Sequence, residues 1–254
     1  MQKEIGQKII YITDMPEIIR EHFQLKETIA TISAYDQANI ETAKQSIREQ
    51  RKYLEDFISR DPFFMITLEP YDRNAEEAPD IVKQMIRCSS VFGIGPMSAV
   101  AGVIAKLAVE AMMEKGAAYA MVDNGGDISV LNDQPVLVGI YAGSSTIKNL
   151  AFEIPSREKP LGIATSSGTV GPSISFGFAD AATVISDDPA LADAAATALG
   201  NAVSISGPLD NCFEAIDEPG IDGALVIRGE EMALWGNLPT LHTARIRPEL
   251  ITKA

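Results

Sequence analysis

The alternation of apolar and polar residues in the first third of the chain predicts three elements. Residues 23–33 alternate and therefore predict a strand with one face in water. Residues 38–60 carry apolar side chains at helical spacing and charges on the other faces, which predicts a long amphipathic helix. An Asp-Pro pair ends that helix, and residues 63–68 predict a strand. Residues 71–78 are polar and acidic, so we expect a surface loop able to join two lobes.

From residue 79 onward the composition changes to small and apolar side chains. Residues 81–91 predict a helix that breaks at a glycine-rich turn, and residues 96–115 predict a second helix. The second helix is rich in Ala, Val and Met on nearly all its faces, which predicts burial in the centre of the protein. Its length and apolarity also fit a membrane span, but Lys106, Glu110 and Glu114 argue against that interpretation.

Short strands and helices follow one another irregularly in the rest of the chain. Strands are predicted over residues 118–123, 127–131, 136–141, 149–154, 161–165 and 178–186, with a closing hairpin over 224–228 and 232–235. Helices are predicted from residue 190 and over 210–216, and a polar tail begins at residue 237. Because strands and helices do not alternate strictly, the pattern predicts an α+β fold of mixed sheets with flanking helices and a buried central helix. We expect a single domain over residues 1–254, in which two lobes would span 1–75 and 76–254.

Charge and cysteine content restrict the partners and the compartment. The formal charge of −14 predicts that nucleic acid is not a partner, because its phosphates would be repelled. Cys88 and Cys212 make neither a disulfide framework nor a CxxC metal motif, which favours a reducing compartment. The N-terminal apolar run is too short for a signal peptide or a membrane span, so we expect a cytoplasmic protein without a membrane partner. His22 and His242 lie far from the motifs below, so a histidine base or a zinc site is not expected.

Asp193 and Thr197 stand four residues apart on a predicted helix and therefore share one of its faces. A carboxylate and a hydroxyl stacked in this way supply hard oxygen ligands, the type that magnesium and calcium prefer. The alternative is a small-residue helix packed on a sheet, whose Asp and Thr are merely hydrogen-bonded or solvated. Spacing alone leaves both interpretations open.

Three loop segments are candidates for holding an anionic or phosphorylated ligand. The candidate cofactor-binding residues in them are Gly95, Ser98, Asn124, Gly125, Gly126, Asp127, Thr165, Ser166, Ser167 and Gly168. The first segment precedes a helix start, where free N–H groups and the helix dipole attract anions. The second and third combine flexible glycines with polar side chains, which allow a ligand to approach the backbone. The alternatives are an ordinary turn, a tight Asn-Gly hairpin turn and a plain Ser/Thr/Gly loop.

Three blocks resemble, in the same order, the signature of ApbE, the FAD:protein FMN transferase family. Residues 119–130 look like the family's Asn-x-Gly-Gly-Asp-Ile strand–turn–strand, and residues 162–168 are similar to its Ala-Thr-Ser-Gly stretch. The strand and helix over residues 178–200 resemble its Thr-Val strand followed by an Asp-Ala-x-x-(x)-Thr helix. The blocks extend over residues 95–205, and the chain looks closest to a cytoplasmic prokaryotic branch of ApbE-like proteins.

The resemblance implies an ApbE-like fold with FAD or FMN as the cofactor. It also implies a magnesium (or calcium) ion that bridges the flavin pyrophosphate. Asp193 would be the charged ligand of that metal, Thr197 a neutral one, and a backbone carbonyl near Ala164 would complete the protein's share. The partner would be a small phosphorylated ligand.

Two departures separate this chain from ApbE enzymes. Where the family carries His-Ile-x-Asp-Pro, residues 171–178 contain neither a histidine nor an Asp-Pro pair, and the family's Gly-Lys-Gly helix start lacks its lysine at residues 93–95. Three functions follow: a non-catalytic binder of flavin or another phosphorylated small molecule, a magnesium-dependent FMN transferase, or an accessory protein in sulfide assimilation for which Cys88 would matter. Whether the chain is an enzyme, and whether it forms a homodimer, stays open.

Overall fold

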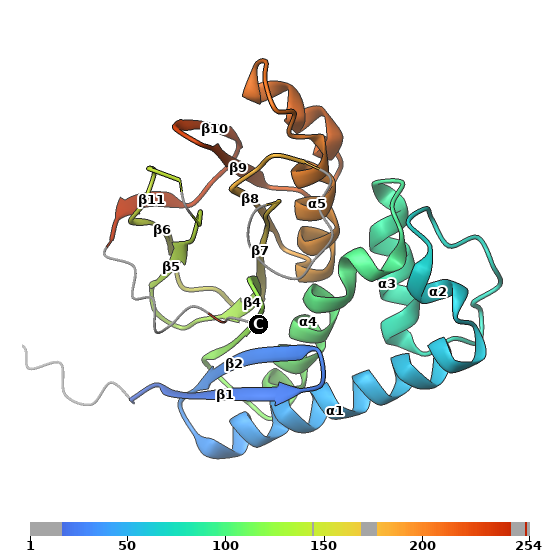
Figure 1. Ribbon diagram of the computed structural model, residues 1–254. Coiled ribbons are helices and arrows are strands. Elements are labelled where there is room, and N and C mark those ends of the chain that lie inside the picture. Colours follow the sequence, from blue (N-terminus) through green and yellow to red (C-terminus); the bar gives the residue numbers. More distant parts are fainter. Residues whose placement is uncertain (1–16, 144, 169–176, 245–251, 253–254) are drawn as a thin grey trace, which may run out of the picture.

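The computed structural model describes residues 17–143, 145–168, 177–244 and 252, and its strands form two antiparallel sheets (Figure 1). The larger sheet has the strand order β1-β2-β3-β4-β7-β8-β9-β10 and the smaller one the order β11-β6-β5. The larger sheet contains β1 (Ile19–Leu25), β2 (Thr28–Ala34), β3 (Ala120–Asn124), β4 (Asp127–Leu131), β7 (Leu161–Ser166), β8 (Ala181–Ser186), β9 (Gly223–Arg228) and β10 (Glu231–Gly236). The smaller sheet contains β5 (Val136–Ile140), β6 (Leu150–Ile154) and β11 (Thr240–Thr243).

The helices lie on one side of the larger sheet, and the smaller sheet lies on the other (Figure 1). They are α1 (Gln37–Arg60), α2 (Phe63–Ile66), α3 (Asp80–Val91), α4 (Val100–Glu114) and α5 (Pro189–Ala202), with 3-10 helices η1 (Pro96–Ala99) and η2 (Leu209–Ile216). This arrangement confirms the predicted α+β class with mixed sheets and flanking helices. β2, from the first predicted lobe, pairs with β3 from the second. The division into two lobes stays a prediction.

Three short segments differ from the sequence prediction. The single strand predicted over residues 23–33 is a hairpin of β1 and β2, in which Lys26 takes a left-handed φ of 53° in the turn. The strand predicted over residues 63–68 is wrong, because Pro62 has helical backbone angles and α2 begins directly after it. The polar tail contains β11, which pairs with β6. In each case a local turn, or pairing with a strand distant in the sequence, determined the structure rather than the pattern of apolar and polar side chains.

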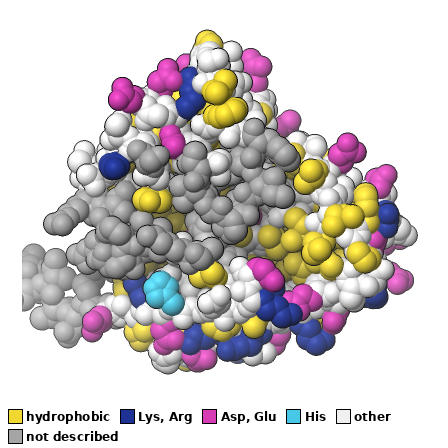
Figure 2. All heavy atoms as spheres, viewed as in Figure 1, with side chains coloured by type: hydrophobic (Ala, Val, Ile, Leu, Met, Phe, Trp, Pro, Cys, Tyr) yellow, Lys and Arg dark blue, Asp and Glu magenta, His cyan; other side chains and the backbone are white. Residues whose placement is uncertain are grey.

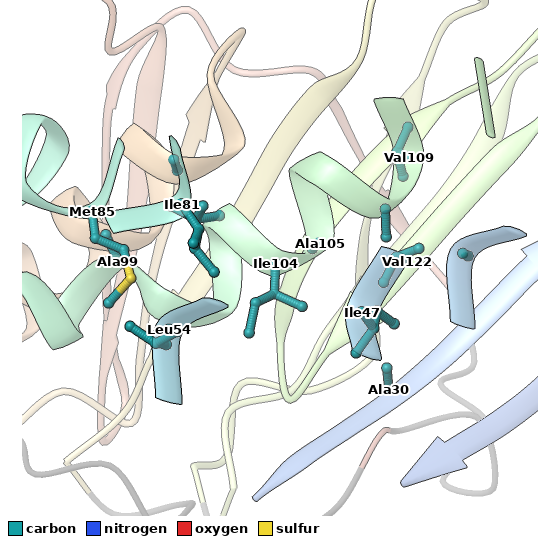
Figure 3. Packing of buried hydrophobic residues seen from close by; sticks show 14 of the residues in the cluster. Ala30, Ile47, Leu54, Ile81, Met85, Ala99, Ile104, Ala105, Val109 and Val122 are labelled. Carbon is teal, nitrogen blue, oxygen red and sulfur yellow. The ribbon is translucent and has the colours of Figure 1, made fainter. Parts of the chain in front are cut away.

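α4 is the predicted central helix, and its apolar side chains lie in the core between α1 and the larger sheet. Figure 3 shows Ile104 and Val109 of α4 beside Ile47 of α1 and Val122 of β3, and all four are buried. Among the described residues, the helical segment Pro96–Glu114 is long and apolar enough to cross a membrane. Its packing against α1, α5, β3 and β4 is that of an internal helix.

α5 lies against β7 and β8 and contacts α4 along its first turns. Eleven of its fourteen residues are buried, and most of these are alanines. Two glycines allow this close approach. A side chain at Gly102 of α4 would collide with Pro189 and Asp193, and one at Gly162 of β7 would collide with Pro189. The small residues therefore fix the distance between α5, α4 and the sheet.

Candidate functional site

A cavity of about 1660 Å³ brings most of the predicted site residues together. It exceeds the roughly 300–1,000 Å³ of typical small-molecule pockets. Its lining includes the predicted residues Asn124, Gly125, Gly126, Asp127, Thr165, Ser166, Ser167, Asp193 and Thr197. These residues come from the β3–β4 turn, the end of β7 and one face of α5, which lie far apart in the sequence. The predicted residues Gly95, Ser98, Ala164 and Gly168 are not among the described residues that line it.

The apolar part of the cavity wall continues onto the surface near α2. Met65 lines the cavity and is half exposed, and Ile66 and Leu68 beside it are 66% and 62% exposed. Hydrophobic side chains gather on this side of the molecule, among charged ones (Figure 2). The cavity thus combines a polar part, formed by the predicted motifs, with apolar side chains from the N-terminal region, α4, β5 and β7.

The β3–β4 turn is a two-residue hairpin turn that its own side chains hold in place. Gly125 and Gly126 have φ values of 70° and 107°, which only glycine adopts readily. A carboxylate oxygen of Asp123 accepts the N–H of Gly126 at 2.9 Å. The side-chain amide of Asn124 donates to the carbonyl of Ala101 at 3.2 Å and so ties the turn to the start of α4. Asp123 lines the cavity although sequence reasoning missed it; an aspartate three residues before a turn glycine is the signal that could have found it.

Asp193 binds the N-terminal end of α4. Its Oδ2 accepts the backbone N–H of Gly102 at 2.7 Å, and the N–H of Ala101 also stabilises the carboxylate. These N–H groups belong to the first turn of α4, close to the positive end of its dipole. The first turn therefore has an acidic partner from another helix.

The neighbouring turn at Gly95 and Ser98 does not favour the predicted anion site. The N–H and the hydroxyl of Ser98 both donate to the carbonyl of Gly95, at 3.2 and 2.7 Å. The N–H of Gly95 donates to Leu68, and the carbonyl of Thr67 leaves no room for a side chain at Gly95. The two donors of Ser98 that the sequence assigned to a ligand anion are used within the turn. The anion at this helix start is the carboxylate of Asp193.

Two carboxyl groups of the cavity are harder to ionise than usual. Burial raises the pKa of Asp193 to about 7, against the opposing effect of the N–H groups of Gly102 and Ala101. Burial also raises the pKa of Asp127 well above its usual value, and the charges of Asp193 and Asp123 raise it further. Like charges close together in a low dielectric repel each other. A bound cation would relieve that repulsion.

Hydroxyl groups add further oxygen atoms to the cavity lining. Thr165 of β7 and Thr183 of β8 are cross-strand partners, and their hydroxyl oxygens lie 2.9 Å apart. Ser166 and Ser167 follow at the end of β7 and also line the cavity. Gly168 donates its N–H to the carbonyl of Ala179 and turns away from the lining.

Within the described part of the chain, no group of three or more His, Cys, Asp or Glu side chains could hold a metal ion by itself. The donors present nevertheless fit a hard cation, because Asp127, Asp193 and Thr197 supply only oxygen atoms. Water or phosphate oxygens would complete the coordination, as is usual for magnesium. Ala164 lies in mid-sheet between Asp127 of β4 and Val184 of β8. Its carbonyl as a metal ligand stays a prediction.

The other candidate groups lie away from this chemistry. Cys88 is fully buried, and burial raises the pKa of its thiol to about 11, so it is no reactive thiol in this structure. His242 pairs with Glu153 on the smaller sheet at 2.6 Å. The departures from the family pattern at residues 171–176 lie outside the described residues.

Comparison with known structures defines the class of the fold. The flavin transferase ApbE from Vibrio cholerae has a TM-score of 0.55 at 13% identity, over 88% of this chain and 97% of that one. The ApbE protein of Thermotoga maritima has a TM-score of 0.56 at 12% identity, over 94% and 100% of the two chains. The fold is therefore that of the ApbE flavin transferases.

Sequence comparison then gives the family. The family model described as "AbpE bacteria" matches residues 12–211. A UPF0280 protein of Methanothrix thermoacetophila is 59% identical over 236 residues, which cover 93% of this chain and 100% of the relative. A UPF0280 protein of Methanosarcina barkeri is 57% identical over 93% and 94% of the two chains. The chain belongs to this ApbE-like family, which confirms the resemblance seen in the three sequence blocks.

Proposed function

We propose that this protein binds a flavin nucleotide, with a divalent cation, in the cavity between the β3–β4 turn and α5. The observation that carries the proposal is the meeting of three distant motifs on one cavity of about 1660 Å³. Two of those motifs contribute buried carboxylates, and the third contributes hydroxyl groups. Solved structures of the same fold are flavin transferases, which supports a flavin as the ligand.

The two parts of the cavity suit the two parts of a flavin nucleotide. The apolar wall on the side of the smaller sheet, which includes Ile128, Val138 and Ile163, fits a flat aromatic ring. The polar wall, which includes Thr165 and Ser166, fits phosphate oxygens as a set of hydroxyl donors.

The cation would be held by the oxygen atoms of Asp127, Asp193 and Thr197. When bound, it would neutralise the charge of a diphosphate and polarise its phosphorus–oxygen bonds. Asp193 would remain fixed by Gly102 of α4, so its orientation does not depend on the ligand. These side chains would thus bind the cation and orient the diphosphate.

Magnesium-dependent transfer of FMN from FAD to a protein is the finer proposal. The fold supports this transfer activity, since solved structures of the same fold are flavin transferases. The sequence lacks the histidine run and the lysine of that enzyme family. We therefore expect no efficient transfer to a standard ApbE acceptor, and a magnesium-dependent mass gain of one FMN on that acceptor would contradict this expectation.

Titration calorimetry and flavin fluorescence test the binding proposal. FAD should bind more tightly with magnesium than without it, and Thr197→Val should remove much of that difference because it loses one oxygen donor. Thr240→Val, an exposed threonine on β11, is the matched control and should change nothing. Binding of ADP with magnesium but not of FMN would assign the site to another phosphorylated small molecule. Failure of FAD, FMN and ADP alike to bind would contradict the proposal.

The accessory role in sulfide assimilation gains no support from Cys88, whose thiol is fully buried. The cytoplasmic location and the homodimer remain proposals from the sequence, as does the exclusion of nucleic acid and membrane partners. Size-exclusion chromatography with light scattering tests the dimer.

A further inference from the structure

A row of polar side chains crosses the larger sheet from its outer edge to the cavity. His22 of β1 lies opposite Thr31 of β2, and Thr31 lies opposite Asp123 of β3. Thr252, near the C-terminal end, lies over this row and is 8% exposed. It is the one described residue of the chain beyond residue 244. The four side chains come from places up to 230 positions apart in the sequence.

Short hydrogen bonds connect these four side chains without a gap. Nδ1 of His22 lies 3.0 Å from the hydroxyl of Thr31, which lies 2.8 Å from the hydroxyl of Thr252. The hydroxyl of Thr252 lies 2.6 Å from Oδ2 of Asp123. Thr31, Thr252 and Asp123 all line the cavity, whereas His22 is exposed at the edge of the sheet. The chain of bonds therefore joins solvent to the cavity.

Counting donors fixes the direction of every bond in this chain. A hydroxyl carries one hydrogen, and an ionised carboxylate carries none. With Asp123 ionised, Thr252 must donate to it, so Thr31 must donate to Thr252 and Nδ1 of His22 must donate to Thr31. With Asp123 protonated, every bond can reverse, and Nδ1 of His22 then accepts. The tautomer of a surface histidine thus reports the protonation of a carboxyl group in the cavity.

We propose that His22, Thr31 and Thr252 form a proton path between solvent and Asp123 in the cavity. In one passage the imidazolium of His22 releases its Nδ1 proton to Thr31. Thr31 passes its own proton to Thr252, and Thr252 passes its proton to Oδ2 of Asp123. The products are a neutral imidazole with its proton on Nε2 and a neutral carboxylic acid, and both hydroxyls are restored. The reverse passage removes the proton from Asp123.

The surroundings of Asp123 act on its pKa in both directions. Burial raises the pKa of Asp123, while the bonds from Thr252 and Gly126 and the charge of His22 act in the opposite direction. The charged groups that act on it among the described residues are His22 on β1 and Asp127 on β4. A ligand that takes up or releases a proton beside the β3–β4 turn could exchange it with solvent while the cavity is occupied. This inference goes beyond flavin binding and does not depend on which ligand the cavity takes.

Nitrogen-15 NMR of the histidine side chains tests the path directly. The chain contains two histidines, so the spectrum has few signals and His242 serves as an internal control. In the wild-type protein at alkaline pH, neutral His22 should carry its proton on Nδ1, which is the less common tautomer of a free histidine. His22 should keep its signals in Thr243→Val, a control on the smaller sheet.

Three variants distinguish the path from a merely structural contact. Thr252→Val breaks the chain with little change of shape, so His22 should change to the common Nε2–H tautomer, while Thr252→Ser should retain the wild-type signals. Asp123→Asn should reverse the chain. Its amide oxygen must accept the N–H of Gly126, so its NH₂ must donate to Thr252, and Nδ1 of His22 must become an acceptor. Wild-type His22 in the Nε2–H form, or a tautomer that Thr252→Val and Asp123→Asn leave unchanged, would overturn the proposal.

Discussion

Asp188 is the N-cap of α5, and Asp193 lies in the second turn of the same helix. Each accepts backbone N–H groups at a helix start, yet their pKa values shift in opposite directions. Asp188 caps α5 itself, accepting the N–H of Ala190 at 3.1 Å, and it pairs with Arg87 at 2.8 Å and Lys106 at 3.2 Å. Burial would raise the pKa of Asp188, but the two cations outweigh it and lower the pKa. Asp193 accepts N–H groups of α4, and burial raises its pKa to about 7.

The difference lies in the neutralising charge. Arg87 and Lys106 lie beside Asp188 and neutralise its negative charge, so its ionised form needs no bound cation. The charge of Asp193 instead raises the pKa of Asp127, which lines the same cavity. A buried carboxylate that the protein leaves without a cation is characteristic of a functional site. The comparison predicts that the charge of Asp188 stabilises the folded protein, whereas the charge of Asp193 lowers its stability and serves binding.

The pH dependence of stability should show the largest difference between the two residues. In the unfolded chain both carboxyl groups have a pKa of about 3.9. Folded Asp193 binds its proton more tightly, so the metal-free protein should lose stability as pH rises from about 4 to 7, by about 1.4 kcal/mol for each unit by which its pKa is raised. Asp188 should act in the opposite sense and lose its stabilisation as pH falls below about 4. Urea unfolding across this range measures both effects.

Asp193→Asn should flatten the loss of stability between about pH 4 and 7, because the amide does not titrate. Asp188→Asn should leave that loss in place. An unchanged slope in Asp193→Asn would show that its carboxyl group titrates alike in the folded and unfolded states.

A change at the α4–α5 contact should have the next largest effect. Gly102→Ala places a methyl group against the carbonyl of Pro189 and Cβ of Asp193. Overpacking of this kind costs about 1–3 kcal/mol, which should exceed the gain of about 1 kcal/mol from helix propensity. We expect a net loss of stability in urea unfolding.

Gly200→Ala on α5 is the matched control. Its new methyl group would meet the hydroxyl of Ser166, a small side chain that can rotate. The free energy of unfolding should stay within about 1 kcal/mol of the wild type or rise. Equal losses in the two variants would show that the contact at Gly102 is not specific.

Asp193→Asn should weaken the binding of magnesium at least tenfold, which corresponds to about 1.4 kcal/mol. The amide keeps an oxygen that accepts the N–H of Gly102, but it loses the charge that attracts the cation. Calorimetry measures the affinity, with Asp188→Asn as the charge-matched control. Equal magnesium affinity in wild type and Asp193→Asn would remove this residue from the site.

Asp188→Asn should have the smallest effect, a loss of about 1 kcal/mol in the free energy of unfolding at neutral pH. The variant keeps a side-chain oxygen for the cap but loses the charge that pairs with Arg87 and Lys106, and such partly exposed pairs contribute little. Thermal unfolding measures it. A loss larger than that of Gly102→Ala would contradict the proposed ranking.

The sequence predicted the elements with strong periodicity and the motifs that meet at the cavity. α1, α4 and the hairpin of β9 and β10 lie close to the predicted positions. One buried face sets the apolar spacing of α1, whereas α4 and β9 stand out as nearly continuous apolar runs. The cap of α5 could also be read from the sequence, since Asp188 stands directly before Pro189.

The partners of the site residues could not be read in this way. Asp193 lies 91 positions from Gly102, and Thr252 lies 129 positions from Asp123. Such bonds depend on how helices and strands pack against one another. The spacing of apolar residues along the chain carries no information about that packing. The sequence also could not show that the N–H and hydroxyl of Ser98 donate to the carbonyl of Gly95, because that bond depends on the backbone conformation of the turn.

The enclosure of α5 has a consequence for isotope exchange. With eleven of fourteen residues buried, its amide hydrogens should reach deuterated solvent only when the whole molecule unfolds. Asp193 and Thr197 would then project from the most slowly opening segment of the chain. Of these two parts of the cavity lining, the glycine turn between β3 and β4 should exchange earlier than α5, so adjustment to an arriving ligand would come from the turn rather than from the helix.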